Sequence, residues 1–226
     1  MSMPDRPAGA ALLLAAVATI AIATAAVASD VRVVDGDTIE VDGTTVRLYG
    51  IDAPEAGQRC ARRGRGAWPC GMDAIAAVVR LVAAGDVVCD DRGRDDYDRL
   101  LAVCTAGGVE INRALVDDGL AWSFRRYSDR YNDAEDTARE RGAGVWQSRS
   151  EPPWEYRAHR WDVAVQATPA GCPIKGNVNR DGVRIYHPPW SPWYGRTKIN
   201  EAAGERWFCD EAEAVAAGWR APAWGR

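Results

Sequence analysis

The stretch that most constrains the fold is SDVRVVDGDTIEVDGTTVRLYGIDAPE, which covers residues 29–55. Apolar and polar residues alternate along it, and Asp-Gly pairs interrupt the alternation. A period of two is typical of strands that bury one face, and Asp-Gly is a strong signal for a tight hairpin. The stretch therefore predicts a meander of three short strands, with Asp42-Gly43 as its clearest turn.

The following segments add helices and two more strands to this meander. Met72, Ile75, Val79 and Val82 recur at helical spacing before Gly85, which predicts a helix over residues 72–84. The segments DVVCDDRG and RLLAVCTAGG predict two strands, and INRALVDDGL and YNDAEDTARERGAGVW predict two more helices. Five strands with a helix between the third and the fourth favour a small closed barrel in an α+β fold.

The rest of the chain predicts smaller units around this domain. Residues 56–71 are rich in arginine and glycine and lack periodicity, which predicts a loop. We expect residues 29–150 to form the main domain and the proline-containing residues 151–170 to form a connecting arm that can include a short helix. The turn-rich, aromatic residues 171–222 predict a small C-terminal module of unknown function.

Residues 1–28 have the pattern of an export signal. Arg6 precedes an apolar stretch from about residue 10 to residue 28, and Ala26-Val27-Ala28 fits a small-x-small cleavage site. The alternative is an uncleaved membrane anchor, because the stretch nearly reaches the roughly 20 residues needed to span a bilayer. In either case we expect the remaining chain to be periplasmic or extracellular. After cleavage we expect a monomer without stable membrane association.

Six cysteines in an exported chain predict disulfides first. Pairing neighbours along the chain suggests three bonds: Cys60–Cys70, Cys89–Cys104 and Cys172–Cys209. Six cysteines allow about 15 connectivities, so the sequence leaves the pairing open. A zinc site formed by Cys172, His187 and Cys209 is an alternative, although the close Cys-x-x-Cys spacing of structural zinc sites is missing.

The candidate chemistry lies at the ends of the first strands. Asp37 and Asp52 follow strands that neighbour each other in a meander, and two close carboxylates repel unless a proton or a cation lies between them. Oxygen ligands without nearby histidine or cysteine favour calcium or magnesium. With Arg47, Arg99 and Glu55 they form a set suited to phosphodiester cleavage. The alternative is that these residues cap turns and form surface ion pairs.

The formal net charge of −4 argues against a protein that coats nucleic acid regardless of sequence. A nuclease needs only a few well-placed cations, so this charge does not exclude one.

Several ordered motifs resemble the staphylococcal nuclease, or thermonuclease, family. They lie between Val31 and Trp146 and comprise VVDGDTIEV, VRLYGIDAPE, DDYDRLLAVC, INRALVDDGLAW and DAEDTARERGAGVW. The resemblance implies a five-stranded OB-fold barrel with three helices. It also implies a calcium-dependent nuclease that acts on DNA and RNA and leaves 3′-phosphate ends.

The resemblance also implies roles for individual residues. Calcium ligands would be Asp37, Asp52 and the backbone carbonyl of Ala53, where the family often has threonine, with Asp95 nearby in an outer position. The catalytic residues would be Arg47, Glu55 and Arg99. Substrate contacts would come from Tyr97 at a terminal phosphate, and from Tyr127 and Arg125 near a base. Arg125 replaces a tyrosine of the family pattern, and a guanidinium can also stack on a base.

Two further questions concern the arginine-rich loop and the class of protein. Arg62 and Arg63 lie in a segment that is a mobile loop beside the active site in the family, where they would guide the phosphate backbone; the alternative is a solvated surface loop. The alternative to a nuclease is a non-catalytic OB-fold module that binds nucleic acid or protein. A third possibility is a nuclease whose C-terminal module anchors it to a surface or partner.

Overall fold

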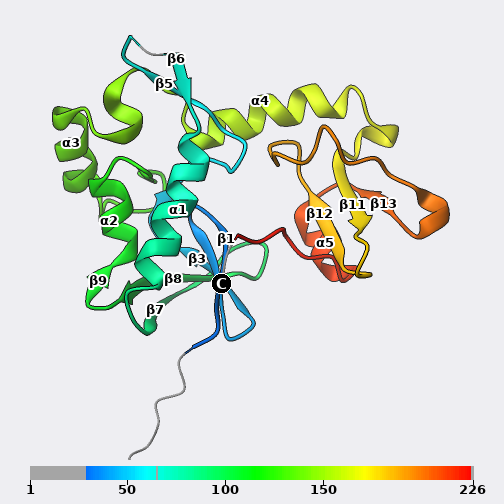
Figure 1. The fold of residues 1–226 in the computed structure, drawn as a ribbon, viewed down its shortest axis with the longest axis horizontal. Helices are drawn as coiled ribbons and strands as arrows, with labels where there is room; N and C mark the ends of the chain where they lie inside the picture. The colour runs from blue at the N-terminus through cyan, green and yellow to red at the C-terminus, as the bar shows by residue number, and fades with distance from the viewer. Residues whose placement is uncertain (1–28, 65, 225–226) are drawn as a thin grey trace, which may run out of the picture.

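The computed structural model describes residues 29–64 and 66–224 (Figure 1). The expected export signal, residues 1–28, lies outside the described residues. Within the described part of the chain, no helix is both long enough and apolar enough to cross a membrane.

The main sheet has six strands, ordered β1-β2-β3-β8-β7 with β9 added to β8. Its strands are β1 (Val31–Asp35), β2 (Thr38–Val41), β3 (Thr44–Leu48), β7 (Val87–Arg94), β8 (Leu100–Ala106) and β9 (Val109–Glu110). The first three form the expected antiparallel meander, in which Asp42 and Gly43 take positive φ values at the tight turn. β3 then pairs with β8 in parallel. The α+β class is confirmed, while closure into a five-stranded barrel stays a prediction.

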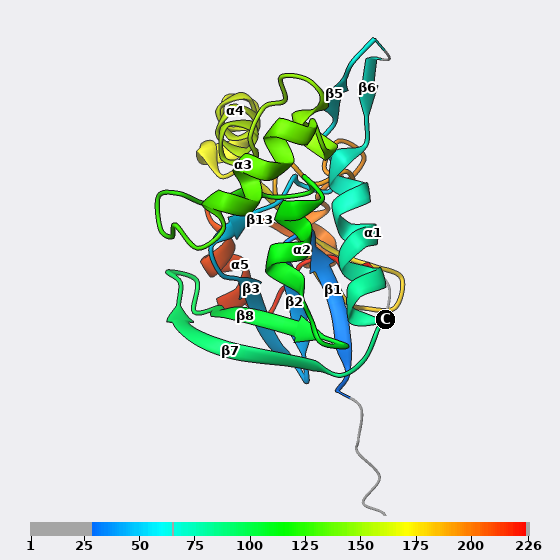
Figure 2. The ribbon, with the colours of Figure 1, turned by 90° about the vertical axis from the view of Figure 1, so that its left-hand side faces the viewer.

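Helices α1 (Cys70–Val82), α2 (Ile111–Asp117) and α3 (Asn132–Arg141) are the three expected helices of this domain. The first begins and ends two residues earlier than the apolar spacing predicted. Figure 2 shows α1 and α2 beside each other over the strands. Their buried residues, including Ile75, Val78 and Leu115, share one core with Val33 and Ile39 of the sheet. The amphipathic pattern therefore determines which helix faces cover the sheet.

Asn112 on α2 fixes the chain that leaves β3. Its side chain is fully buried and donates to the carbonyl oxygens of Tyr49 (3.0 Å) and Ala102 (3.1 Å). It also accepts a hydrogen bond from the amide of Cys104 (3.0 Å). Buried backbone groups without partners are costly, so this one side chain holds the segment that leads to β4 (Ile51–Asp52) against β8.

The segment of residues 56–71 is not the irregular loop that we predicted. It contains an antiparallel hairpin of β5 (Cys60–Arg62) and β6 (Gly66–Trp68), which projects from the domain in Figure 1. Strands of three residues are too short to show a periodic pattern, so the prediction missed them. A disulfide between Cys60 and Cys70 closes the base of this hairpin.

All six cysteines form disulfides. The bonds are those between neighbours along the chain: Cys60–Cys70, Cys89–Cys104 and Cys172–Cys209. The alternative zinc site is therefore wrong, because the sulfurs of Cys172 and Cys209 bind each other. His187 instead makes hydrogen bonds to Ser191 and Asn177. Disulfides persist in oxidising compartments, so three of them fit the expected export.

Most of the predicted connecting arm is one 13-residue helix, α4 (Pro153–Val165), which is longer than the short helix that we expected there. Proline at its first position is favourable, because that residue needs no amide donor there. The ring of Trp154 stacks on Phe124 with centroids 5.7 Å apart, and the Tyr156 hydroxyl donates to the carbonyl of Gly57 (3.3 Å). These contacts hold α4 against the main domain.

Residues beyond α4 form a second, three-stranded sheet ordered β12-β11-β13. Its elements are β11 (Ile174–Val178), β12 (Arg184–His187), β13 (Arg206–Phe208) and the short helix α5 (Glu211–Ala216). They enclose a separate core of Ile174, Tyr186, Phe208, Ala214 and Trp219. The chain then returns to the first sheet, where the amide of Trp224 donates to the carbonyl of Val33 (2.6 Å).

The remaining short elements are β10 and three turns of 3-10 helix. β10 (Trp122–Ser123) pairs with β4, and the 3-10 turns are η1 (Gly144–Gln147), η2 (Pro169–Gly171) and η3 (Glu201–Ala203).

Candidate active site

Arg47 lies between the two expected metal-binding carboxylates, Asp37 and Asp52. The β2–β3 register places Arg47 opposite Thr38, and therefore beside Asp37 in the preceding turn. Its guanidinium donates to Asp37 Oδ1 (2.9 Å) and to Asp52 Oδ1 (3.0 Å). The two carboxylates would otherwise repel. One arginine on β3 thus holds together the turn between β1 and β2 and the end of β4.

Asp37 and Asp52 are both buried. Asp37 also accepts from the Thr38 hydroxyl (3.0 Å) and from the amide of Ala53 (2.9 Å). Burial opposes ionisation of Asp37, but Arg47 and the Ala53 amide outweigh it and lower its pKa. Asp37 is therefore an anion in a fixed orientation.

Glu55 is only 7% exposed, at the turn that follows β4. The Gln58 side chain accepts from its amide (3.1 Å), and its carbonyl accepts from the Gln58 amide (2.7 Å). Burial raises the pKa of Glu55 to about 7, while the guanidinium of Arg157 acts in the opposite direction. A carboxylate with a pKa near neutrality is suited to general-base catalysis.

Arg99 and Tyr97 come from the turn before β8 and line the same cavity as Arg47 and Glu55. Asp95 orients Arg99, because it accepts from Arg99 Nε (2.7 Å) and from the Arg99 amide (3.0 Å). The guanidinium of Arg99 lies 5.1 Å from the centre of the Tyr97 ring. The structure thus brings the proposed catalytic residues and Tyr97 to one cavity.

The other predicted substrate contacts lie outside the residues that line this cavity. Arg125 pairs with Glu135 and Asp136 on α3, at 3.1 and 2.6 Å. Tyr127 is 63% exposed. Arg62 on the β5–β6 hairpin lies over the ring of Trp68 (5.5 Å), and Arg63 is in the turn of the same hairpin. Contacts of these side chains with substrate stay predictions.

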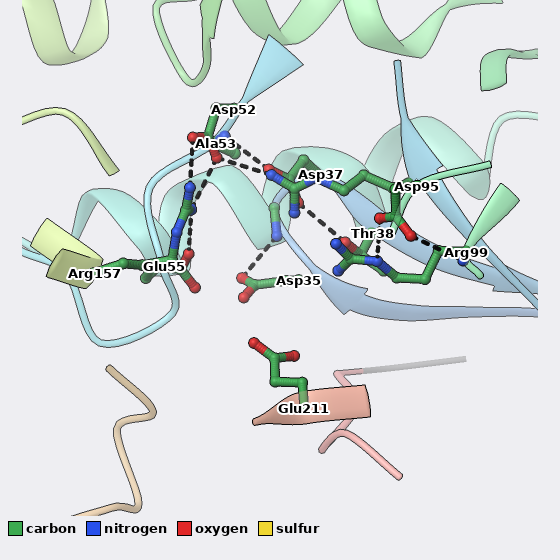
Figure 3. A network of polar contacts seen from close by, with 12 residues as sticks. Asp35, Asp37, Thr38, Asp52, Ala53, Glu55, Asp95, Arg99, Arg157 and Glu211 are labelled. Atoms are coloured by element: carbon green, nitrogen blue, oxygen red, sulfur yellow. Dashed lines mark hydrogen bonds and ion pairs between the residues drawn. The ribbon is translucent and has the colours of Figure 1, made fainter. Parts of the chain in front are cut away.

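Two residues at the site were not identified from the sequence. Arg157 on α4 binds Asp52 and Glu55 from a position 102 residues beyond Glu55 (Figure 3). Asp35 at the end of β1 also lines the cavity, and burial together with the carboxylates of Glu55 and Asp37 raises its pKa well above the usual range. The acidic turn around Asp35 was a usable signal, whereas no local pattern marks Arg157.

The cavity has a volume of about 530 Å³ and lies between the main domain and the second sheet. Its wall on the C-terminal side includes the aromatic residues Tyr186, Trp190, Trp193, Trp219 and Trp224. Glu211 of α5 also lines it and faces the main-domain carboxylates in Figure 3. The residues 171–222 therefore form part of the candidate site.

The donor set fits calcium chemically. Ca²⁺ accepts carboxylates, backbone carbonyls and water in flexible geometry, and Asp37, Asp52 and the Ala53 carbonyl are such donors. In the described residues, no three side chains of Asp, Glu, His or Cys lie close enough to form a complete metal cage. A calcium ion would thus need carbonyl or water ligands besides the two carboxylates.

The mixed sheet and its helices make this an α+β protein. The paired carboxylates and arginines at the end of the sheet form a site suited to phosphate esters. Comparison with known proteins gives the family. The family model described as Staphylococcal nuclease homologue matches residues 45–148, and the chain belongs to this family through that domain. A second family model, described as ArfC, matches residues 162–221.

Individual relatives agree with this assignment. A probable staphylococcal-like nuclease of Oryza sativa subsp. japonica is 33% identical over 117 residues, which is 50% of this chain and 22% of that protein. The succinoglycan biosynthesis protein ExoI of Rhizobium meliloti is 34% identical over 110 residues, 46% of this chain and 56% of its own. A micrococcal nuclease of Shigella flexneri is 31% identical over 125 residues, 49% of this chain and 66% of its own. The chain thus spans about a fifth to two thirds of these relatives.

Proposed function

We propose that this protein is an exported, calcium-dependent phosphodiesterase that hydrolyses DNA and RNA to 3′-phosphate ends, acting as a monomer. The observation that carries the proposal is the convergence of Asp37, Arg47, Asp52 and Glu55 at one buried cluster beside the cavity that Arg99 also lines. A module that only binds nucleic acid would not need this set. The family membership and the nucleases among the relatives support the same chemistry.

In the proposed reaction, Glu55 accepts a proton from the attacking water, and the water oxygen bonds to phosphorus. The bond from phosphorus to the 5′-oxygen breaks, and that oxygen takes up a proton from solvent. Arg47 uses two of its five N–H donors on Asp37 and Asp52, so donors remain for a phosphate oxygen. Arg99 supplies a second guanidinium at the same cavity. A calcium ion held by Asp37, Asp52 and the Ala53 carbonyl would offset charge that develops on the phosphate.

The cavity supports a nucleotide-sized substrate. Its volume of about 530 Å³ lies within the usual range for small-molecule sites. Arginines on one wall suit the phosphate, and aromatic rings on the opposite wall suit a base.

Digestion of single-stranded DNA by the oxidised protein from Ser29 onward tests the proposal. It compares calcium, chelator and the Glu55→Gln variant. Calcium-dependent cleavage to 3′-phosphate ends should occur in the native protein and fall by at least about 100-fold in the variant. A folded protein that binds DNA but does not cleave it would favour the non-catalytic module instead.

A further inference from the structure

Arg157 reaches the active site from a part of the chain that neither family match covers. The nuclease match ends at residue 148, and the second match begins at residue 162. Arg157 lies between them on α4, which packs on the main domain through Trp154 and Tyr156. Its contacts with the site therefore come from the connecting helix, at a position outside both matched segments.

The guanidinium of Arg157 binds Asp52 with two parallel hydrogen bonds. Nη1 donates to Oδ1 (3.0 Å) and Nη2 donates to Oδ2 (2.8 Å). Nη1 also donates to Glu55 Oε1 (2.7 Å). The Asp52 side chain is fully buried, and that of Arg157 is 23% exposed. Bidentate arginine–carboxylate pairs are among the strongest hydrogen-bonded pairs in proteins, and here solvent is largely excluded.

These contacts use the oxygens that a metal ion would need. Asp52 Oδ1 already accepts from both Arg47 and Arg157, and Oδ2 accepts from Arg157. A carboxylate offers about four acceptor positions, so one position on Oδ2 remains. A divalent cation there would lie next to a fixed guanidinium, and like charges repel strongly in a poorly solvated site.

We propose that Arg157 is a built-in competitor of the catalytic cation: the ion binds fully only when the guanidinium leaves Asp52. This inference rests on the proposed function, because it assumes that Asp52 is a metal ligand. Helix α4 then sets the calcium affinity of the site, and a tight hold by Arg157 on Asp52 raises the calcium concentration needed for occupancy.

A purely structural role for Arg157 makes the opposite prediction. If the arginine only fastens α4 to the main domain, its loss would loosen the site and leave calcium affinity equal or weaker. The helix has other attachments that do not involve Arg157, including a hydrogen bond from the Gln58 side chain to the Glu151 carbonyl (2.7 Å) just before it. Replacement of Arg157 should therefore leave the helix docked.

Calorimetric titration of Ca²⁺ alone into the oxidised protein from Ser29 onward tests the competition at fixed ionic strength. The variants are Arg157→Gln and, as a charge-matched control, Arg160→Gln on the same helix. Arg160 donates to the carbonyl of Pro189 (3.2 Å), away from the carboxylates. We expect the calcium Kd to fall by at least about tenfold in Arg157→Gln and to change less than about twofold in Arg160→Gln.

Circular dichroism and thermal unfolding without calcium show whether the variants fold. If Arg157→Gln does not fold, Arg157→Lys replaces it, since an ammonium group cannot bind both Asp52 oxygens in parallel. Its calcium Kd should also lie below that of the native protein. An equal or higher Kd in the folded variant overturns the competition.

The nuclease assay separates this inference from the proposed function. Native protein that binds calcium and cleaves DNA, with no tighter binding in the Arg157 variant, refutes the competition alone. Absence of calcium binding in both the native protein and the Arg157 variant refutes both.

Discussion

Gly71 should control the position of Glu55, although it lies 16 residues away on α1. A Cβ atom added at Gly71 would lie 1.7 Å from the Glu55 carbonyl oxygen and 2.5 Å from its carbonyl carbon. Both atoms are backbone, so no side chain can rotate away. Real Cβ atoms essentially never approach closer than 3.0 Å. The Gly71→Ala variant must therefore move the two segments apart by more than about 1 Å.

That movement falls on the turn that holds the proposed catalytic base. The Glu55 carbonyl accepts from the Gln58 amide, and the Gln58 side chain binds the Glu55 amide. Misplacement of a catalytic group by about 1 Å can cost about 100-fold in rate. We therefore expect kcat on single-stranded DNA with calcium to fall by about 100-fold. Unfolding in urea should show a loss of about 1–3 kcal/mol.

Gly195→Ala is the matched control. Nothing lies within 4 Å of a Cβ added there, and its φ is outside the left-handed region. Its activity and stability should stay near those of the native protein. If Gly71→Ala kept its kcat within about threefold and its unfolding free energy unchanged, the steric argument for the position of Glu55 would be refuted.

Two further predictions concern the second sheet. The Cys172–Cys209 bond spans a sequence separation of 37, so replacing both residues by serine should lower the free energy of unfolding by about 4 kcal/mol. Urea unfolding followed by tryptophan fluorescence measures this loss, and a value below about 1 kcal/mol would contradict the prediction. Burial lowers the pKa of His187 to about 4 from an ordinary value near 6.5. The unfolded protein therefore takes up a proton on His187 at a higher pH than the folded protein does, so the stabilising effect of neutral His187 is complete above pH 6.5 and is lost as the pH falls toward 4. Between pH 7 and 4.5, the free energy of unfolding of the native protein should fall by on the order of 2 kcal/mol more than that of His187→Asn. Equal losses in both proteins would show that His187 does not titrate in this way.

The parts of the fold that the sequence predicted are those encoded by local patterns. Period-two alternation and the Asp42-Gly43 turn define the meander, because both act over a few neighbouring residues. The helical spacing placed α1 within two residues of its bounds. The β5–β6 hairpin was missed because each strand has only three residues.

The candidate site likewise contains contacts that local sequence patterns predict and contacts that they do not. Asp37 and Arg47 meet through the paired strands β2 and β3, and Asp52 follows Arg47 by only five residues, so their closeness follows from segments that can be read locally. Arg157 meets Asp52 across 105 residues, and α4 has only a weak apolar stripe. That contact depends on tertiary docking, which no short pattern encodes. The cavity wall from the second sheet has the same origin.

The return of the chain to Val33 has a consequence for solubility. In the described residues, β1 has one full strand neighbour, β2, and lies at the end of the sheet path. An open sheet edge is a template for pairing with another molecule. Trp224 occupies part of that edge through its bond to the Val33 carbonyl. We therefore expect the C-terminal segment to shield the main domain against self-association, and molecules that lose it should aggregate more readily.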